Sequence, residues 1–138
     1  MKRAKLFIFD VNTLISAFVI GSQTNAKAFD RAISIGRIIT SPPIQSELSN
    51  VFLRPKFDRF VSLEDRLAFL TYLDRQMLSW SLPISAIQAS RDPKDDKYLE
   101  LGVAAEATCI ITGDNDLLIL HPFHNIPILS AADFLIQF

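Results

Sequence analysis

Acidic residues stand where apolar runs of this sequence end and where a helix is expected to begin. Asp10 follows the apolar run 5–9, and Asp114 follows the β-rich run 108–112. A further acidic group precedes an apolar helical pattern and consists of Asp92, Asp95 and Asp96. Carboxylates supply hard oxygen ligands, which suit Mg²⁺ or Mn²⁺, whereas zinc prefers His or Cys. These residue types favour chemistry carried out by a bound metal ion.

Short strand-like runs alternate with helical patterns along the chain. The expected strands cover 5–9, 37–40, 81–84, 108–112 and 126–129. Such alternation predicts an α/β fold, in which a central, mostly parallel β-sheet is flanked by α-helices in three layers. Right-handed crossovers bring the carboxyl ends of the strands to one edge, where open α/β folds place their sites. Asp10 and Asp114 are therefore expected to meet there, and helix capping alone is a poor account of both.

Helices are expected between these strands. Their approximate ranges are 12–18, 24–35, 42–52, 63–79, 98–105, 116–120 and 130–137. In the helix 42–52, Glu47 stands at the border of the buried face, next to Leu48. Because this helix follows the second strand at the same sheet edge as Asp10, Glu47 becomes a further candidate ligand.

The length of 138 residues suits one domain, 1–138, and a hydrophobic fraction of 49% supports a sizeable core. The single cysteine, Cys109, cannot form an internal disulfide and lies in an apolar run, which indicates a buried core residue in a reducing, cytoplasmic setting. No run approaches the roughly 18 apolar residues of a membrane span. We therefore expect no membrane association.

Basic residues predominate outside the suspected site. Without the five suspected site acids, 10 acidic residues remain against 14 Lys and Arg, which gives that remainder a positive balance. The link after the helix 42–52 gathers Arg54, Lys56 and Arg59, with Phe57 and Phe60 between them. Such residues contact phosphates and stack on bases in single-stranded RNA-binding sites. The alternative is a solvated loop whose aromatic rings face the core.

Four segments, in this order, resemble those of PIN-domain nucleases, especially the VapC-like toxins of bacterial toxin–antitoxin systems. They are FDVNTLISA at 9–17, SEL at 46–48 with LRPKF at 53–57, RDPKDDKYLEL at 91–101 and ITGDNDLL at 111–118. Each segment is weakly specific, but the ordered set covers nearly the whole chain. The resemblance implies a single PIN-like domain.

The resemblance also implies a set of site residues. The implied catalytic and metal-binding acids are Asp10, Glu47, Asp96 and Asp114. Asp116 is implied as an auxiliary metal ligand, and Asn12 and Thr112 as polar supports that orient ligands or a water. Asp92 and Asp95 compete with Asp96 for the third acid. Asp96, eighteen residues before Asp114, fits the spacing of the family best.

The implied activity is that of a divalent-metal-dependent endoribonuclease, a hydrolase acting on ester bonds that serves as the toxin of a toxin–antitoxin pair. Bound Mg²⁺ or Mn²⁺ would lower the pKa of a water and polarise the scissile phosphate. RNA is the implied substrate, bound with help from Arg54, Lys56 and Arg59. A second copy of the chain, as a homodimer, and a cognate antitoxin protein are the implied partners.

Two other interpretations stay open. A phosphatase of the haloacid-dehalogenase type also places an Asp after its first strand, but it needs a second Asp where Asn12 stands. A catalytically silent PIN scaffold that binds RNA or protein is the second alternative. Such scaffolds tend to have lost the site acids, and all of these acids are present here.

The two histidines, His121 and His124, do not indicate a zinc site, because neither a cysteine nor a third histidine joins them. We expect them to lie in a loop.

Overall fold

A five-stranded parallel sheet lies at the centre of the computed structural model, which describes residues 3–138. The strand order is β3-β2-β1-β4-β5. The strands are β1 (Leu6–Phe9), β2 (Arg37–Thr40), β3 (Met77–Ser79), β4 (Cys109–Ile111) and β5 (Ile128–Leu129). Phe7, Ile8 and all of β4 are fully buried, which explains why these strands are continuous apolar runs.

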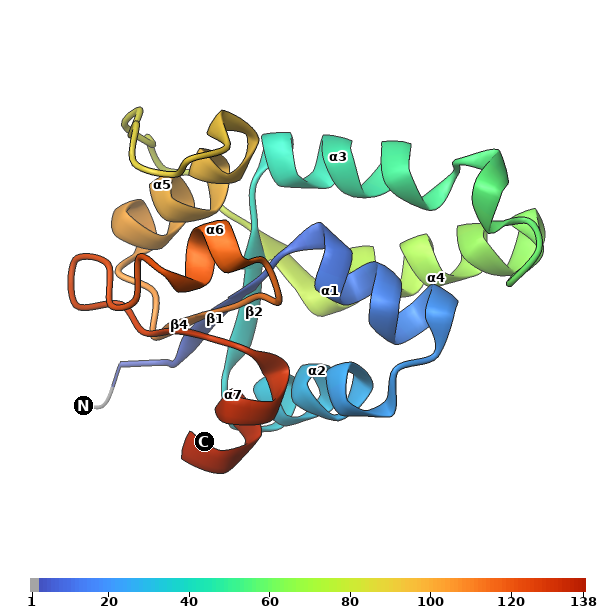
Figure 1. The fold of residues 1–138 in the computed structure, drawn as a ribbon, viewed down its shortest axis with the longest axis horizontal. Helices are drawn as coiled ribbons and strands as arrows, with labels where there is room; N and C mark the ends of the chain where they lie inside the picture. Colours follow the sequence, from blue (N-terminus) through green and yellow to red (C-terminus); the bar gives the residue numbers. More distant parts are fainter. Residues whose placement is uncertain (1–2) are drawn as a thin grey trace.

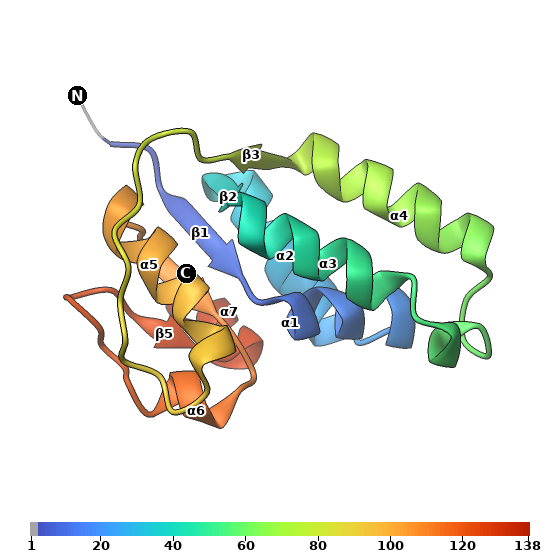
Figure 2. The same ribbon diagram turned by 90° about the horizontal axis from the view of Figure 1, so that it is seen from above.

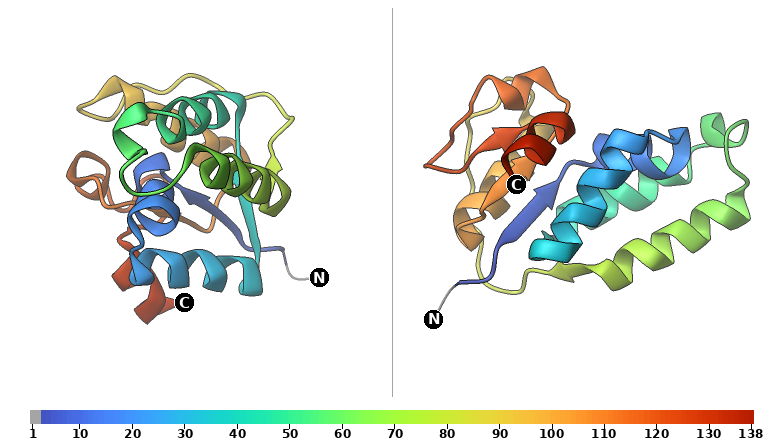
Figure 3. Two further views of the ribbon diagram at one scale, coloured as in Figure 1. Left: turned by 90° about the vertical axis from the view of Figure 1, so that its right-hand side faces the viewer. Right: turned by 90° about the horizontal axis from the view of Figure 1, so that it is seen from below.

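Helices cover both faces of the sheet, so the predicted three-layer α/β fold is confirmed. They are α1 (Val11–Ile15), α2 (Gln23–Ile35), α3 (Pro42–Phe52), α4 (Leu63–Gln76), α5 (Asp96–Ala105), α6 (Asn115–Leu118) and α7 (Ala131–Gln137). Figure 1 shows α3 and α5 on one side of the sheet and α2 and α7 on the other. The last two pack against each other (Figure 3). Edge-to-face aromatic pairs fill this layer, with the rings of Phe7 and Phe134 centred 5.3 Å apart.

The region after α4 differs from the sequence prediction. The helix ends at Gln76, three residues early, and the chain continues as β3, where Leu78 pairs with Ile39 of β2. Residues 81–84, predicted as a strand, belong instead to the loop between β3 and α5. The apolar residues at 77 and 78 suited either structure, and non-local pairing with β2 decided for the strand.

The structure explains why glycine occupies positions 21 and 102. Gly21, at φ 92°, ends the π-helical segment Ser16–Ile20 in the left-handed region that favours glycine. Gly102 lies inside α5, where an added Cβ would come within 3.2 Å of the Ile110 side chain, so close packing explains it. Burial raises the pKa of the Cys109 thiol to about 12, as suits a core residue. Among residues 3–138, every helix is too short or too polar to cross a membrane.

The strand order places a crevice between β1 and β4. From β1 the chain moves to one side, to β2 and β3, and later returns to the other side for β4 and β5. Crossover helices on opposite faces leave an open place at the carboxyl ends of the two central strands. In Figure 2, the carboxyl end of β1, α6 and the start of α5 lie at this same end of the sheet.

Candidate functional site

Asp10 lies at the carboxyl end of β1 and is almost fully buried, with 4% of its surface exposed. Its Oδ1 accepts a hydrogen bond from the backbone N–H of Thr13, 2.6 Å away, and so caps α1. Its Oδ2 accepts a hydrogen bond from the hydroxyl of Thr112, the residue after β4. Burial raises the pKa of Asp10, against the opposing effect of these hydrogen bonds, and the charge of Asp114 raises it further.

Thr112 links the two central strand ends. Its hydroxyl donates to Asp10 and accepts from the backbone N–H of Asp114 at 3.0 Å. Because the side chain is fully buried, this hydroxyl has a fixed environment. Thr112, expected as a polar support, thus contacts through one hydroxyl an acid after β1 and the backbone of an acid after β4.

Three carboxylates come together next to Asp10 and Thr112. Asp95, Asp114 and Asp116 each offer an oxygen, and the three oxygens lie within 4.8 Å of one another. The backbone N–H of Asp116 also donates to Asp114 Oδ1 at 2.8 Å, so the turn after β4 fixes both residues. Burial and the adjacent Asp114 carboxylate raise the pKa of Asp95 to about 7. Like charges held this close repel one another unless a cation or a proton offsets them.

Asp96, which the resemblance implies as the third acid, does not belong to this group of three oxygens. Its Oδ1 accepts hydrogen bonds from the backbone N–H groups of Ala89 and Ser90, at 3.2 and 2.7 Å. Asp96 thus anchors the loop before α5, whereas Asp95 contributes the third carboxylate to the acidic group. Asp92, the remaining candidate, is exposed and caps the short 3-10 turn Pro93–Asp95 through Lys94 N–H.

Glu47 is held by two residues of α5. Its Oε2 accepts a hydrogen bond from the hydroxyl of Tyr98 at 3.1 Å and pairs with Lys97 Nζ at 2.8 Å. The Tyr98 hydroxyl accepts in turn from the backbone N–H of Val11, at the residue after Asp10. Tyr98 therefore ties Glu47 to the end of β1. Burial raises the pKa of Tyr98 far above its usual range, so its hydroxyl stays protonated and able to donate to Glu47.

Two cavities open next to these acids. One, of about 330 Å³, is lined by Asp10, Asn12 and Asp114 among others, so the exposed Asn12 faces the same space as two of the acids. The other, of about 440 Å³, lies on the side of Glu47, and its lining includes three bases: Arg54 after α3, Lys94 before α5 and Lys97 of α5.

The basic link, which consists of Arg54, Lys56 and Arg59, makes different contacts at each of its residues. Arg54 lines the Glu47 cavity. Lys56 lies over the ring of Phe57, which is buried at 7% exposure, and Arg59 lies over the ring of Phe60, which is 50% exposed. Of the two aromatic rings expected to stack on bases, only Phe60 is accessible.

Sequence reasoning missed three residues of this region. Tyr98 falls in the predicted helix 98–105 without a signal that marks its hydroxyl, and Lys97 is one of several lysines in the acidic segment before it. Arg66 of α4 is fully buried and was not considered, although it donates to the carbonyls of Phe52 and Arg54 at 2.8 and 3.0 Å. The sequence signal for Arg66 is its helical spacing, three residues after Leu63 and four before Leu70, which places a charged residue in line with two apolar ones.

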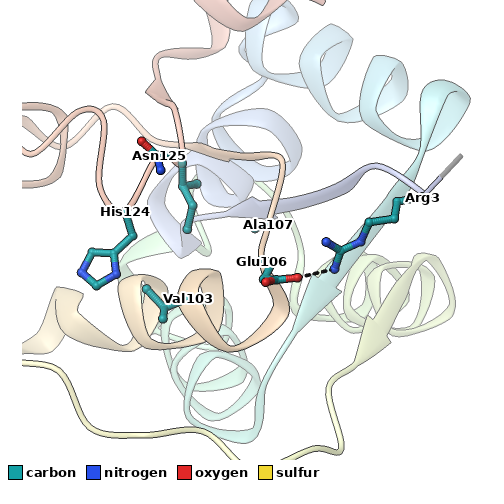
Figure 4. Close-up of a pocket in the computed structure, with 7 residues that line it drawn as sticks. Arg3, Val103, Glu106, Ala107, His124 and Asn125 are labelled. Carbon is teal, nitrogen blue, oxygen red and sulfur yellow. Dashed lines mark hydrogen bonds and ion pairs between the residues drawn. The ribbon is translucent and has the colours of Figure 1, made fainter.

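A separate cavity of about 420 Å³ lies at the amino-terminal edge of the sheet. Figure 4 shows Arg3 paired with Glu106 there, at 2.5 Å, with His124 across the space. Both histidines lie in the loop before β5, as expected: the ring of His124 stacks on Phe123, and His121 Nδ1 accepts from the backbone N–H of Ile128.

The acidic group fits a hard divalent cation. Its donors are carboxylate oxygens, without His or Cys, which is the set that Mg²⁺ and Mn²⁺ accept. Asp95 Oδ2 is buried and has no hydrogen-bond partner among the described residues. An unpartnered buried carboxylate oxygen facing other carboxylates is unfavourable in the protein alone and is satisfied by a cation.

Comparisons with known proteins bear on the fold and on the family of this chain. The chain is 28% identical over 123 residues to the uncharacterized protein MJ1680 of Methanocaldococcus jannaschii, covering 87% of this chain and 78% of that protein. Among solved structures, a chain of VapBC2 from Rickettsia felis, crystallised with a DNA fragment from its promoter, superposes with a TM-score of 0.61 at 12% identity. The match covers 89% of this chain and 96% of that one. The PIN domain of RRP44 from T. brucei gives a TM-score of 0.49 at 17% identity, covering 97% of this chain and 80% of that one. Residues 7–116, which run from β1 into α6 and include all the acids described above, match the PIN domain family, and the chain belongs to that family.

Proposed function

We propose that this protein is a divalent-metal-dependent endoribonuclease whose centre is built from Asp10, Asp95, Asp114 and Asp116. The observation that carries the proposal is the close approach of three carboxylate oxygens within 4.8 Å, beside the buried Asp10, at the switch point of the sheet. Membership of the PIN domain family, whose members are generally nucleases, supports a hydrolase acting on phosphodiester bonds.

Each residue has a distinct part in this proposal. A bound Mg²⁺ or Mn²⁺ would supply an activated water and polarise the scissile phosphate. Thr112 and the N–H of Thr13 hold the Asp10 carboxylate in one orientation. Tyr98 and Lys97 hold Glu47, and Tyr98 ties it to the residue after Asp10, so that Glu47 would orient a water of the centre through hydrogen bonding. Asn12 faces the open cavity and is placed to contact the substrate strand.

The proposed partners are RNA, a second copy of the chain and a small inhibitor protein. Support for an interface comes from the exposed face of α4, where Leu63 and Leu67 are 51% and 48% exposed and Phe60 precedes the helix. Apolar side chains that gather on one face of a helix mark an interaction surface. The likeness of the fold to the VapBC2 chain supports a role as the toxin of a toxin–antitoxin pair.

The deciding experiment incubates purified protein with single-stranded RNA, with Mg²⁺, with Mn²⁺ and with chelator. Cleavage should require the metal and should be lost in Asp95→Asn and Asp114→Asn, while Asp30→Asn, an exposed acid of α2, should retain it. DNA of the same sequence tests the preference for RNA. If folded wild-type protein binds RNA but leaves it intact with either metal, the chain is a silent scaffold and the nuclease proposal is wrong.

A further inference from the structure

The cavity beside Glu47 has an excess of positive charge that the protein itself leaves unused. Its lining includes Arg54, Lys94, Lys97, Glu47 and Glu100. Both carboxylates are already engaged: Glu47 by Lys97 and by the Tyr98 hydroxyl, and Glu100 by the backbone N–H of Ile87 at 3.0 Å. Within residues 3–138, Arg54 and Lys94 form no ion pair with an acidic side chain. Two cations therefore face this space without an ion pair, and the lining as a whole carries one net positive charge.

This cavity adjoins the proposed metal centre. Lys94 and Lys97 flank Asp95 along the turn that starts α5, so the same turn presents an acid to the metal centre and bases to the cavity. The cavity volume of about 440 Å³ far exceeds the roughly 30 Å³ that one water occupies in the liquid. It has room for a phosphate group together with its sugar.

We infer that the cavity between α3 and α5 is a subsite for a phosphodiester of the RNA strand, next to the one that is cleaved, and that Arg54 and Lys94 bind it. Lys97, which pairs with Glu47, lies between the subsite and the metal centre and keeps their relative position fixed. The inference rests on the proposed function for its substrate. Arg54 thus acts together with Lys94 and Lys97 from the turn that starts α5. Lys56 and Arg59, which do not line the cavity, take no part in the subsite.

The test compares two double variants with the same change in net charge. One is Arg54→Glu with Lys94→Glu; the control is Lys27→Glu with Arg75→Glu, two exposed bases on α2 and α4. Both are made in an Asp114→Asn background, with metal chelated, so that RNA is bound without being cut. Affinity for a fluorescein-labelled single-stranded RNA is measured by anisotropy over a potassium chloride series.

The cavity variant should bind about tenfold or more weakly than the control, and its salt slope should fall by about 0.7 for each phosphate that the variant no longer neutralises. Equal affinity and slope in the two variants would overturn the inference, as would an absence of RNA binding by the parent protein. An Arg54→Gln, Lys94→Gln variant repeats the comparison without adding acids. Metal-dependent cleavage by wild type is measured separately, so an equal effect of the two variants on binding, with cleavage intact, refutes the subsite alone.

Discussion

A carboxylate oxygen of Asp95 lies within 4.8 Å of one from Asp114, while the carboxylate of Asp96, the next residue, accepts hydrogen bonds from the backbone of Ala89 and Ser90. Neighbouring residues in a helical turn point about 100° apart, because a turn contains about 3.6 residues. A step of one residue at the start of α5 therefore separates an acid of the proposed metal centre from an acid that anchors a loop.

The first prediction separates these two roles. Asp95→Asn should reduce RNA cleavage by at least about 100-fold, equivalent to about 2.7 kcal/mol of barrier, with little loss of stability. Asp96→Ala should destabilise the protein by about 1–3 kcal/mol, because two backbone N–H groups lose their acceptor, and should keep most activity at low temperature. Urea denaturation and single-turnover cleavage measure both quantities. The opposite pattern would return the third position to Asp96.

The second prediction concerns the protein without metal. The pKa of Asp95 is raised from 3.8 to about 7 by burial and by Asp114, so ionisation of Asp95 destabilises the fold. Between these pKa values the folded state binds more protons than the unfolded state, and stability falls as pH rises. In chelator, wild type should therefore melt at a higher temperature near pH 5.5 than near pH 7.5.

Asp95→Asn provides the matched control for this prediction. In chelator at pH 7.5 it should melt above wild type, because a neutral amide can donate to Asp114, and its melting temperature should depend less on pH. Saturating Mn²⁺ at about 100 times its Kd should stabilise wild type by about 2.7 kcal/mol and the variant much less. A variant that melts below wild type in chelator would make Asp95 a structural residue.

The sequence was sufficient for the strand ends but not for the turn that starts α5. Asp10 and Asp114 could be placed because each ends an apolar run, and parallel strands align their carboxyl ends. The choice between Asp95 and Asp96 depends on the 3-10 turn Pro93–Asp95, which sets where α5 begins. Sequence patterns locate helix starts only to within a few residues, and here one residue decides the side chain's direction.

Non-local contacts explain the other differences. Leu78 suited a helix or a strand, and its pairing with Ile39 of β2 selected the strand. Tyr98 matched the apolar face of α5, yet its hydroxyl contacts Val11 and Glu47, residues from two other elements. Such contacts join positions far apart in the chain, so no local pattern reveals them.

The third prediction tests the hydroxyl that joins the two strand ends. Thr112→Val keeps the shape of the side chain but leaves Asp10 Oδ2 and the N–H of Asp114 without their partner. We expect a loss of about 1–3 kcal/mol in stability, measured by urea denaturation, together with weaker metal binding measured by calorimetry. Thr112→Ser should restore both. Equal behaviour of the valine and serine variants would show that the methyl group, and not the hydroxyl, matters.

The fourth prediction concerns the position of Glu47. Tyr98→Phe removes the hydroxyl that donates to Glu47 and accepts from Val11 N–H. If Glu47 acts only when correctly oriented, kcat should fall about tenfold with KM nearly unchanged, the pattern expected for an interaction made in the transition state. Glu47→Gln, which keeps the Tyr98 contact but removes the charge, should lose more activity. An unchanged kcat in Tyr98→Phe would assign the hydroxyl to folding alone.

The last prediction concerns Arg66, whose fully buried guanidinium joins α4 to the end of α3. Its donors reach the carbonyls of Phe52, Arg54 and Val61, and it pairs with Asp58. Arg66→Met fills a similar volume but leaves these carbonyls without a donor, so we expect a loss of about 2–4 kcal/mol. The matched control is Arg75→Met on the same helix, where an exposed side chain should change stability by less than about 0.5 kcal/mol.

Because Arg66 also fixes the backbone of Arg54, the Met variant should weaken RNA binding even under conditions where it is fully folded. Hydrogen exchange should then be faster at residues 52–61 than in wild type, with β1 and β4 unaffected, since the central strands lie outside these contacts. Urea denaturation, hydrogen exchange and RNA anisotropy together test whether loss of the Arg66 contacts loosens residues 52–61 and thereby weakens RNA binding. Stability equal to that of Arg75→Met would show that water replaces the guanidinium at these carbonyls, and the link would then owe its position to other contacts.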